Sequence, residues 1–323
     1  MKAVVSDQYG PPDVLQLQEV KKPVPKDNQV LVKIHAVSLN FGNLVLLKGE
    51  PFLARFAFGL TKPKYRIPGG DISGRVEAVG KNVTQFQPGD EVFGDLSGCG
   101  WGGFAEYVAV PEDALVLKPA NLSCEEAAAV PMAGVTALQG LRDKGKIQSG
   151  QKVLINGASG GVGTFAVQIA KSFGAEVTGV CSTRNIDILQ SIGADDVIDY
   201  TKEDVTKKTK TFDLIVGVNG HHSISDYKRL LNPNGTFVHI GGSGSQMFQA
   251  MALGPWISLT EKKKVGTFLQ RANQKDLLIL MKELIEDGKV KPVIDRCYKL
   301  DEVKEAFSYF AEGHAQGKVV LSV

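Results

Sequence analysis

The sequence predicts an α/β protein with two domains: a barrel-like β domain, and a doubly wound parallel sheet covered by helices. Three observations support this fold class. The chain has 323 residues, which at roughly 150 residues per domain corresponds to about two domains. The first third contains short alternating strands, and from residue 151 strands alternate with helices. Strand–helix alternation is typical of a parallel sheet.

Short strands separated by turns fill the first third. Residues 29–35 and 74–80 alternate apolar and polar side chains, as strands with one buried face do. A turn at residues 88–90 precedes a strand at 91–94, and another strand is expected at 102–111. Closely spaced strands with frequent turns indicate a barrel.

The second domain begins with helices. Ser123 and Glu126 form the S-x-x-E pattern of a capped helix, and another helix follows Pro131 to about Lys144. The expected strands are 152–156, 176–181, 196–199, 212–216, 236–240 and 265–269, with helices at 161–173 and 186–192. This order predicts a doubly wound sheet of the Rossmann type.

The tail returns to the β domain. Helices are expected at 276–286 and 302–311, and strands at 293–300 and 318–323. We therefore expect a discontinuous catalytic domain at 1–122 and 271–323, with the Rossmann domain at 123–270.

Composition excludes several classes of function. The net charge is +2, so neither nucleic-acid nor membrane-surface binding has electrostatic support. The four cysteines are far apart and form no C-x-x-C pair. Their spacing is typical of a reducing compartment, so we expect a cytoplasmic protein without a disulfide framework or a cysteine-built zinc site.

A glycine-rich motif follows the expected strand at 152–156 and begins the next helix. Glycines stand at positions 157, 160, 161 and 163. They allow the backbone to approach a pyrophosphate, which the helix N-terminus attracts. We therefore predict dinucleotide binding; the alternative is a tight turn without a ligand.

The type of dinucleotide is predicted from residues 182–185, which follow the second strand. Binders of NAD usually place Asp or Glu here for the ribose 2′-hydroxyl. Ser182, Thr183 and Arg184 offer two hydroxyls and a guanidinium but no acid. This is chemistry for a 2′-phosphate, so we predict NADPH. The alternative for Arg184 is an exposed charge at the start of a helix.

Several segments together resemble one family over nearly the whole chain. They are residues 9–15, 38–40, 69–76, 88–92, 103–108, 157–163, 199–200 and 313–318. The chain resembles the medium-chain dehydrogenase/reductase superfamily, in its zinc-free quinone oxidoreductase branch. The resemblance implies a GroES-like β catalytic domain and a Rossmann domain.

The resemblance also implies site residues. Ser182, Arg184 and Tyr200 would hold the 2′-phosphate, and Asn40 and Thr136 would lie near the nicotinamide. The remaining expected cofactor residues are Ala158, Ser159, Gly160, Gly161, Val162, Asn219, Gly241, His314 and Gln316. For His314 the alternative is a turn residue.

Zinc ligands are missing from the matching positions. Alcohol dehydrogenases of this superfamily hold catalytic zinc from three segments, which correspond here to residues 38–40, 69–71 and 132–134. Two of the three ligand positions carry no ligating side chain, so we expect no metal. Asp71 is then expected to be structural. His221 and His222 are adjacent in sequence and form a poor chelate.

Candidate proton donors are Tyr65, Ser38 and, more weakly, Tyr9. Tyr65 follows an apolar and basic insertion at residues 51–64, which is either a flap over the substrate or a loop packed on the barrel through its phenylalanines. Asn43 departs from the family, where Asp is common.

The predicted function is NADPH-dependent, zinc-independent reduction of a quinone or an α,β-unsaturated carbonyl, that is, of a small apolar electrophile. Both substrate classes accept hydride without a metal, because the charge delocalises onto oxygen. The alternatives are a non-catalytic NADPH-binding protein and, less favoured, a zinc alcohol dehydrogenase.

We also expect a homodimer. Residues 241–259 form an apolar stretch that includes Trp256 and leads into a sixth strand at the edge of the sheet. Alternatively, this stretch folds inward and lines a substrate pocket.

Overall fold

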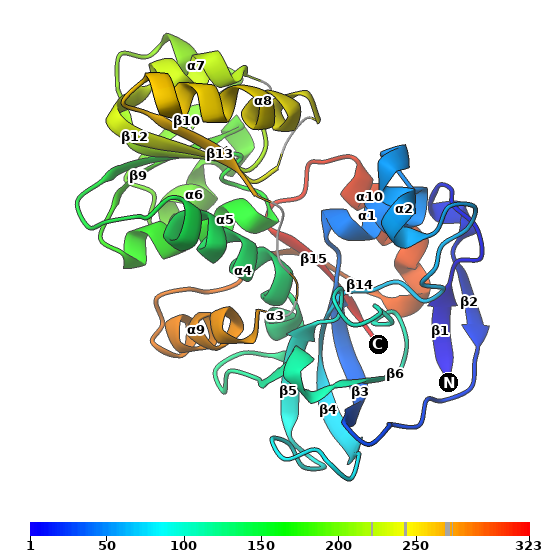
Figure 1. The fold of residues 1–323 in the computed structure, drawn as a ribbon. Helices are drawn as coiled ribbons and strands as arrows, with labels where there is room; N and C mark the ends of the chain where they lie inside the picture. The colour runs from blue at the N-terminus through cyan, green and yellow to red at the C-terminus, as the bar shows by residue number, and fades with distance from the viewer. Residues whose placement is uncertain (221, 242–243, 269–271, 273) are drawn as a thin grey trace. The chain divides into compact units, whose positions relative to one another are not determined.

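The computed structural model describes residues 1–220, 222–241, 244–268, 272 and 274–323. The chain forms two compact units, shown in Figure 1. The first contains Met1–Ala133, Arg271–Glu286 and Pro292–Val323, and the second contains Gly134–Gln270 and Asp287–Lys291. The fold class is confirmed: a mixed β unit and a parallel Rossmann sheet.

The first unit is built on a seven-stranded sheet in the order β14-β15-β3-β4-β5-β7, with β6 paired to β3. Its pairs are antiparallel except β14–β15. The bounds are β3 (Gln29–Ser38), β4 (Asp71–Val79), β5 (Glu91–Asp95), β6 (Tyr107–Pro111), β7 (Leu115–Leu117), β14 (Ile294–Lys299) and β15 (Lys318–Ser322). A separate antiparallel pair joins β1 (Lys2–Val5) to β2 (Gln16–Glu19).

Alternation along β3 builds the core of this unit. Val30, Val32 and Ile34 are buried, while Lys33 is exposed. The helices of the unit are α1 (Phe41–Lys48), α2 (Arg55–Phe58), α3 (Cys124–Ala128), α9 (Lys275–Glu286) and α10 (Val303–Ala311). Phe307 of α10 meets Phe104 edge to face inside the core, which fixes that helix on the barrel.

The second unit contains a six-stranded, entirely parallel sheet in the order β10-β9-β8-β11-β12-β13. In Figure 1, α7 and α8 lie on one side of this sheet and α4 and α5 on the other. The strands are β8 (Lys152–Asn156), β9 (Glu176–Cys181), β10 (Asp196–Asp199), β11 (Phe212–Gly217), β12 (Leu231–His239) and β13 (Lys264–Thr267). The helices are α4 (Pro131–Leu138), α5 (Gly161–Ser172), α6 (Ile186–Ser191), α7 (Ile224–Arg229) and α8 (Gly244–Thr260).

The division between the units differs from the boundary expected at 122/123. Residues 123–133 belong to the first unit. Ala128 and Ala129 pack against Ala36 of β3 and Val320 of β15, so this helix covers the barrel sheet. Residues 287–291 belong to the second unit, where Lys291 exchanges two hydrogen bonds with Gln168.

Two expected elements change their limits. The strand expected at 102–111 begins only at Tyr107, because the residues before it pair with β1: Ala105 forms a bridge with Ala3, and the Val4 backbone nitrogen donates to the Phe104 carbonyl at 2.8 Å. The strand expected at 236–240 begins already at Leu231, and its ladder with β11 shifts register between Leu231 and Thr236. Among the described residues, no helix is long and apolar enough to span a bilayer.

Candidate functional site

The glycine loop joins β8 to α5. Gly157 has a φ of 83°, and a Cβ there would lie 2.7 Å from the backbone nitrogen of Asn219. A Cβ on Gly163 would lie 2.2 Å from the carbonyl oxygen of Gly157. At Gly160 a Cβ would meet only that same oxygen, at 3.8 Å, so this side of the loop is open. The open side lies at the N-terminus of a 12-residue helix, whose first N–H groups have no intrahelical partner. These features fit the diphosphate of a dinucleotide.

A buried amide ties this loop to the end of the next strand. Asn185 Nδ2 donates to Ser159 Oγ at 2.9 Å and to Ser182 Oγ at 3.2 Å. Asn185 Oδ1 is buried and has no hydrogen-bond partner among the described residues. The sequence analysis missed Asn185, because a single Asn at a helix start predicts only a cap.

The residues expected at the 2′-phosphate come together beside this amide. Asp199 pairs with Cys181 in the β9–β10 ladder, and the Tyr200 backbone nitrogen donates to the Cys181 carbonyl at 3.0 Å. The parallel ladder therefore brings Tyr200 to the strand end that continues into Ser182 and Arg184. Arg184 is exposed, and Tyr200 is 58% exposed.

A carboxylate also lies at this corner. Asp199 Oδ2 accepts from Thr183 Oγ1 at 2.5 Å, and Oδ1 accepts from Thr201 N at 3.0 Å and Thr201 Oγ1 at 2.7 Å. Lys202 Nζ lies 3.5 Å from Oδ2. These donors, Thr183 above all, lower the pKa of Asp199 to about 2. The acid-free window at 182–185 did not predict it, because Asp199 comes from the neighbouring strand.

Other expected cofactor residues of the second unit follow adjacent strand ends. The Asn219 backbone nitrogen donates to the Asn156 carbonyl at 3.2 Å, and the Gly241 nitrogen donates to the Gly217 carbonyl at 3.2 Å. Both therefore lie at the carboxyl edge of the sheet, with the glycine loop. Ala158 is buried there and Thr136 is buried on α4, whereas Gly161 and Val162 are partly exposed.

Asn40, His314 and Gln316 belong to the first unit. His314 is exposed, and the Gln316 backbone nitrogen donates to Asp295 at 3.0 Å. Asn40 is buried before α1, where its own backbone nitrogen donates to Asn43 Oδ1 at 2.8 Å.

The side chain of Asn40 enters a buried polar cluster around Asp71. Asp71 Oδ2 accepts from Asn40 Nδ2 at 2.9 Å and from Ser38 Oγ at 3.4 Å, and both carboxylate oxygens lie 3.1 Å from Met132 N. Lys318 Nζ lies 3.9 Å from Oδ2. Complete burial raises the pKa of Asp71 to about 7 and lowers that of Lys318 to about 8.

This cluster does not fit zinc. The three segments that correspond to the zinc ligands do converge, but they supply one carboxylate, one hydroxyl, an amide and a backbone N–H, and an ammonium lies beside them. Zinc sites in proteins are built from thiolate, imidazole and carboxylate ligands. Within the described ranges, no group of three His, Cys, Asp or Glu side chains could hold a metal. His222 Nε2 lies 3.7 Å from Asp204 Oδ1; His221 lies outside the described residues.

The candidate proton donors have different environments. Ser38 is completely buried, because the β3–β4 register places it opposite Asp71. Tyr65 is half-buried, with Lys64 Nζ 5.3 Å from its ring centroid. The hydroxyl of Tyr9 donates to the Gly59 carbonyl at 2.5 Å, and burial raises its pKa.

The phenylalanines of the insertion at 51–64 lie in two different environments, and neither alternative for its role is tested by them. Phe58 is half-buried, and its ring meets Trp101 edge to face at 6.3 Å. Phe52 and Phe56 are exposed and contact each other at 6.2 Å. Phe58 therefore packs against Trp101, and Phe52 and Phe56 remain on the surface.

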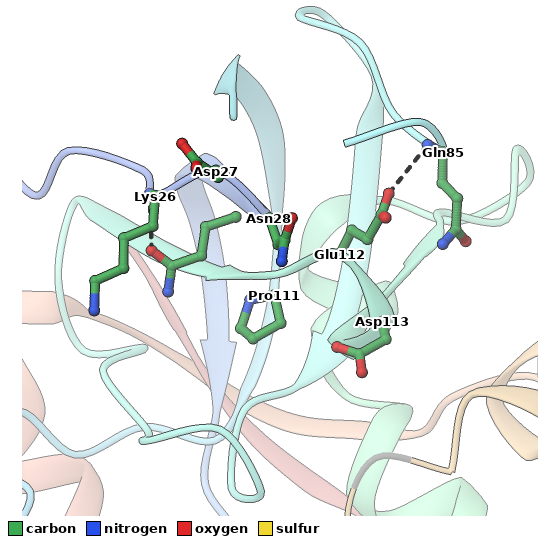
Figure 2. Close-up of a pocket in the computed structure, with 8 residues that line it drawn as sticks. Lys26, Asp27, Asn28, Gln85, Pro111, Glu112 and Asp113 are labelled. Atoms are coloured by element: carbon green, nitrogen blue, oxygen red, sulfur yellow. Dashed lines mark hydrogen bonds between the residues drawn. The ribbon is translucent and has the colours of Figure 1, made fainter. Parts of the chain in front are cut away.

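A pocket of about 950 Å³ lies at another place in the first unit, shown in Figure 2. None of the expected site residues lines it. The Glu112 carboxylate accepts from the backbone nitrogens of Thr84 and Gln85, both at 3.1 Å, and Asp27 pairs with Lys81 at 3.0 Å. Two of its acidic groups thus have structural partners, and we assign it no function. The lining residues are Lys26, Asp27, Asn28, Gln29, Gln85, Pro111, Glu112 and Asp113.

Comparison with known proteins identifies the family. Residues 26–120 match the alcohol dehydrogenase GroES-like domain, and residues 192–321 match a family described as zinc-binding dehydrogenase. The chain is 36% identical over 319 residues to a chloroplast envelope quinone oxidoreductase homolog of Arabidopsis thaliana, covering 95% of this chain and 93% of that protein. It is 36% identical over 333 residues to a 2-methylene-furan-3-one reductase of Solanum lycopersicum, covering 99% and 79% of the two chains.

A solved structure agrees with these matches. The quinone oxidoreductase of Coxiella burnetii superposes with a TM-score of 0.87 at 31% identity, covering 100% of this chain and 99% of the other. The relatives and the solved structure match almost the entire length of the chain, and the two family models match residues 26–120 and 192–321. The chain belongs to the medium-chain dehydrogenase/reductase superfamily of oxidoreductases, in its quinone oxidoreductase-like branch.

Proposed function

We propose that the protein is an NADPH-dependent, zinc-independent reductase of quinones or α,β-unsaturated carbonyls. The observation that carries this proposal is the glycine loop before α5, open at Gly160 and closed to side chains at Gly157 and Gly163. The relatives of the chain include a quinone oxidoreductase homolog and a 2-methylene-furan-3-one reductase.

The corner beside this loop supports NADPH over NADH. The guanidinium of Arg184 and the hydroxyls of Ser182 and Tyr200 are groups that bind a phosphate dianion. Thr183, Thr201 and Lys202 already engage both oxygens of Asp199, so this carboxylate is poorly placed to accept a ribose hydroxyl. The 2′-phosphate of NADPH would therefore find the guanidinium of Arg184 here. The 2′-hydroxyl of NADH would find only Asp199, whose two oxygens already have hydrogen-bond or ionic partners.

The reaction needs no metal in this proposal. When bound, NADPH supplies a hydride to the electron-poor carbon, and the substrate oxygen takes the charge. The residues of the chain bind and orient the reactants and exclude water. A proton then comes from water or from a hydroxyl such as that of Tyr65.

Steady-state oxidation of NADPH across a panel of quinones and enones tests the function. We expect turnover that a chelator leaves intact, and purified protein without stoichiometric zinc. Chelator-sensitive activity restored by zinc would instead indicate an alcohol dehydrogenase. Tight NADPH binding without turnover on any member of the panel would favour a non-catalytic NADPH-binding protein.

A further inference from the structure

The glycine loop of the second unit lies against the end of β9. The Ala158 backbone nitrogen donates to the Val180 carbonyl at 3.1 Å, and a Cβ on Gly179 would lie 3.2 Å from the Cβ of Ala158. Ser159 follows in the loop and Ser182 follows β9, and both are partly exposed. The close packing of the two segments therefore brings two serine hydroxyls to the same part of the surface.

A single buried side chain bridges the two serines. Asn185 is 5% exposed, and its Nδ2 donates to Ser159 Oγ at 2.9 Å and to Ser182 Oγ at 3.2 Å. Asn185 precedes α6, where Asn commonly caps a helix, yet its side chain makes no capping hydrogen bond. Its Oδ1 is buried without a hydrogen-bond partner in the described part of the chain, which costs stability. The amide therefore serves the two serines rather than the helix.

This bridge fixes the serines as acceptors. A serine hydroxyl has one hydrogen and two lone pairs, and one lone pair of each serine here accepts from Asn185. No described residue accepts a hydrogen bond from either hydroxyl. The hydroxyl of Thr183, in contrast, donates to Asp199. Ser159 and Ser182 thus each keep a hydrogen for a ligand.

The ligand that fits these two donors is a phosphate. The two oxygens are bonded to the same nitrogen, so they are close enough together to reach one phosphate group. The exposed Arg184, two residues after Ser182, adds a positive charge. Hydroxyl donors beside a guanidinium are the chemistry that binds a phosphate dianion.

We propose that Asn185 is a positioning residue that sets the preference for NADPH over NADH: it holds the hydroxyl oxygens of Ser159 and Ser182, so that both hydrogens are donated to the 2′-phosphate. This inference rests on the proposed NADPH dependence. Asn185 acts through the serines and does not itself bind the phosphate. NADH gains little from these donors, because its 2′-hydroxyl carries no charge.

Fluorescence titration with NADPH and with NADH tests the proposal without turnover. We expect Ser159→Ala, Ser182→Ala and Asn185→Ala each to raise the Kd for NADPH about 5- to 20-fold, because hydrogen bonds to a charged group are lost or weakened. The Kd for NADH should change less than about twofold. Asn185→Asp has nearly the same shape but only accepts hydrogen bonds, so it should also reduce the preference for NADPH.

A mutant cycle tests whether Asn185 acts through the serines. Adding Asn185→Ala to Ser159→Ala/Ser182→Ala should change the Kd for NADPH less than about twofold, because its targets are already gone. Ser191→Ala is the matched control. The Ser191 hydroxyl donates to the Ile188 carbonyl within α6 at 2.8 Å, so its loss should leave both dissociation constants unchanged.

Each failure has its own meaning. If Asn185→Ala weakens NADPH and NADH equally, or weakens NADPH just as strongly in the absence of both serines, the positioning role is wrong. A wild type that binds both cofactors equally overturns the NADPH dependence and this role together. A wild type that prefers NADPH but reduces no quinone or enone overturns only the reductase function. Should Asn185→Ala not fold, Asn185→Asp replaces it, and an unchanged preference there also overturns the role.

Discussion

Asp71 in the first unit and Asp199 in the second are each held by several hydrogen-bond donors, yet their pKa values shift in opposite directions. Burial raises the pKa of Asp71 to about 7 despite bonds from Asn40 and Met132. Hydrogen bonds lower the pKa of Asp199 to about 2, because they outweigh its desolvation. Donors alone therefore do not set the charge of a carboxyl group. In the first unit, Asp71 and its partner Lys318 are buried. In the second unit, Asp199 lies at the end of β10.

The largest expected effect follows from removing the counter-ion inside the first unit. Asp71→Ala leaves the Lys318 ammonium buried without its partner, and should lower the free energy of unfolding by about 3–5 kcal/mol. The matched control is Asp71→Asn/Lys318→Met, which removes both charges and should lose far less. Urea titration followed by circular dichroism measures both. Equal losses in the two variants would show that the pair is not the source of the effect.

The exposed cation of the second unit should matter for binding instead. Arg184→Ala is expected to weaken NADPH binding by about 1–3 kcal/mol, because a charge-assisted contact is lost. Binding of NADH should hardly change, since it lacks the 2′-phosphate. Lys202→Ala, at the same corner, is the control for loss of a nearby charge. Fluorescence titration with both cofactors decides; equal weakening of both would contradict the assignment of Arg184.

The two carboxyl groups also predict opposite slopes of stability with pH. Asp199 has a lower pKa in the folded protein than in the unfolded chain. Its stabilising contribution to the free energy of unfolding is therefore present above about pH 4 and is lost as pH falls toward 2. Asp71 has a folded pKa above its unfolded value, so its contribution is present below about pH 4 and is lost as pH rises toward 7.

Unfolding curves between pH 2 and 7 separate the two groups. Thr183→Val should reduce the loss of stability below pH 4, because it removes the first donor to Asp199. Asp71→Asn should remove the decline between pH 4 and 7. If the free energies of unfolding of the wild type and of Asp71→Asn change in parallel between pH 4 and 7, the raised pKa of Asp71 is contradicted.

The smallest effect concerns assembly of the second unit. β13 is an edge strand, and α8 beside it exposes Phe248, Met251, Leu259 and Trp256, the last at 69%. Ile257 of the same helix is buried in the unit's core, so the exposed face is not the inward one. We propose that two copies pair here, covering the edge strand.

Light scattering at micromolar concentration tests the pairing. We expect a dimer that Trp256→Arg converts to a monomer while the protein stays folded. Leu117→Ser, on the first unit, is the control for loss of an exposed apolar side chain. A monomeric wild type would reject the dimer.

Sequence reasoning succeeded where the pattern is local. The glycine turn between β8 and α5 and the alternation of strands and helices follow from neighbouring residues. It failed where a partner comes from far along the chain. Asp199 reaches Thr183 from the next strand, and Lys318 reaches Asn40 across 278 positions. No periodicity encodes such a contact, because the register of the whole sheet decides it.

The limits of the compact units differ from the expected boundary at 122/123 for a related reason. Residues 123–133 have helical patterning like the rest of the following domain, so composition alone groups them with it. Their small alanines fit the barrel sheet through Ala36 and Val320, which are nearly 300 residues apart. The fold of one unit thus depends on both ends of the chain.

This dependence has a consequence for synthesis on the ribosome. Asp71 and Asn40 emerge early, but β15, which carries their ammonium partner, is made only after the second unit. Until β15 emerges, the nascent barrel lacks a central strand, and the edges of β3 and β14 that β15 will join stay open. The second unit has its whole parallel sheet before then. The inserted unit can therefore fold first, and the emergence of β15 then completes the sheet of the surrounding unit.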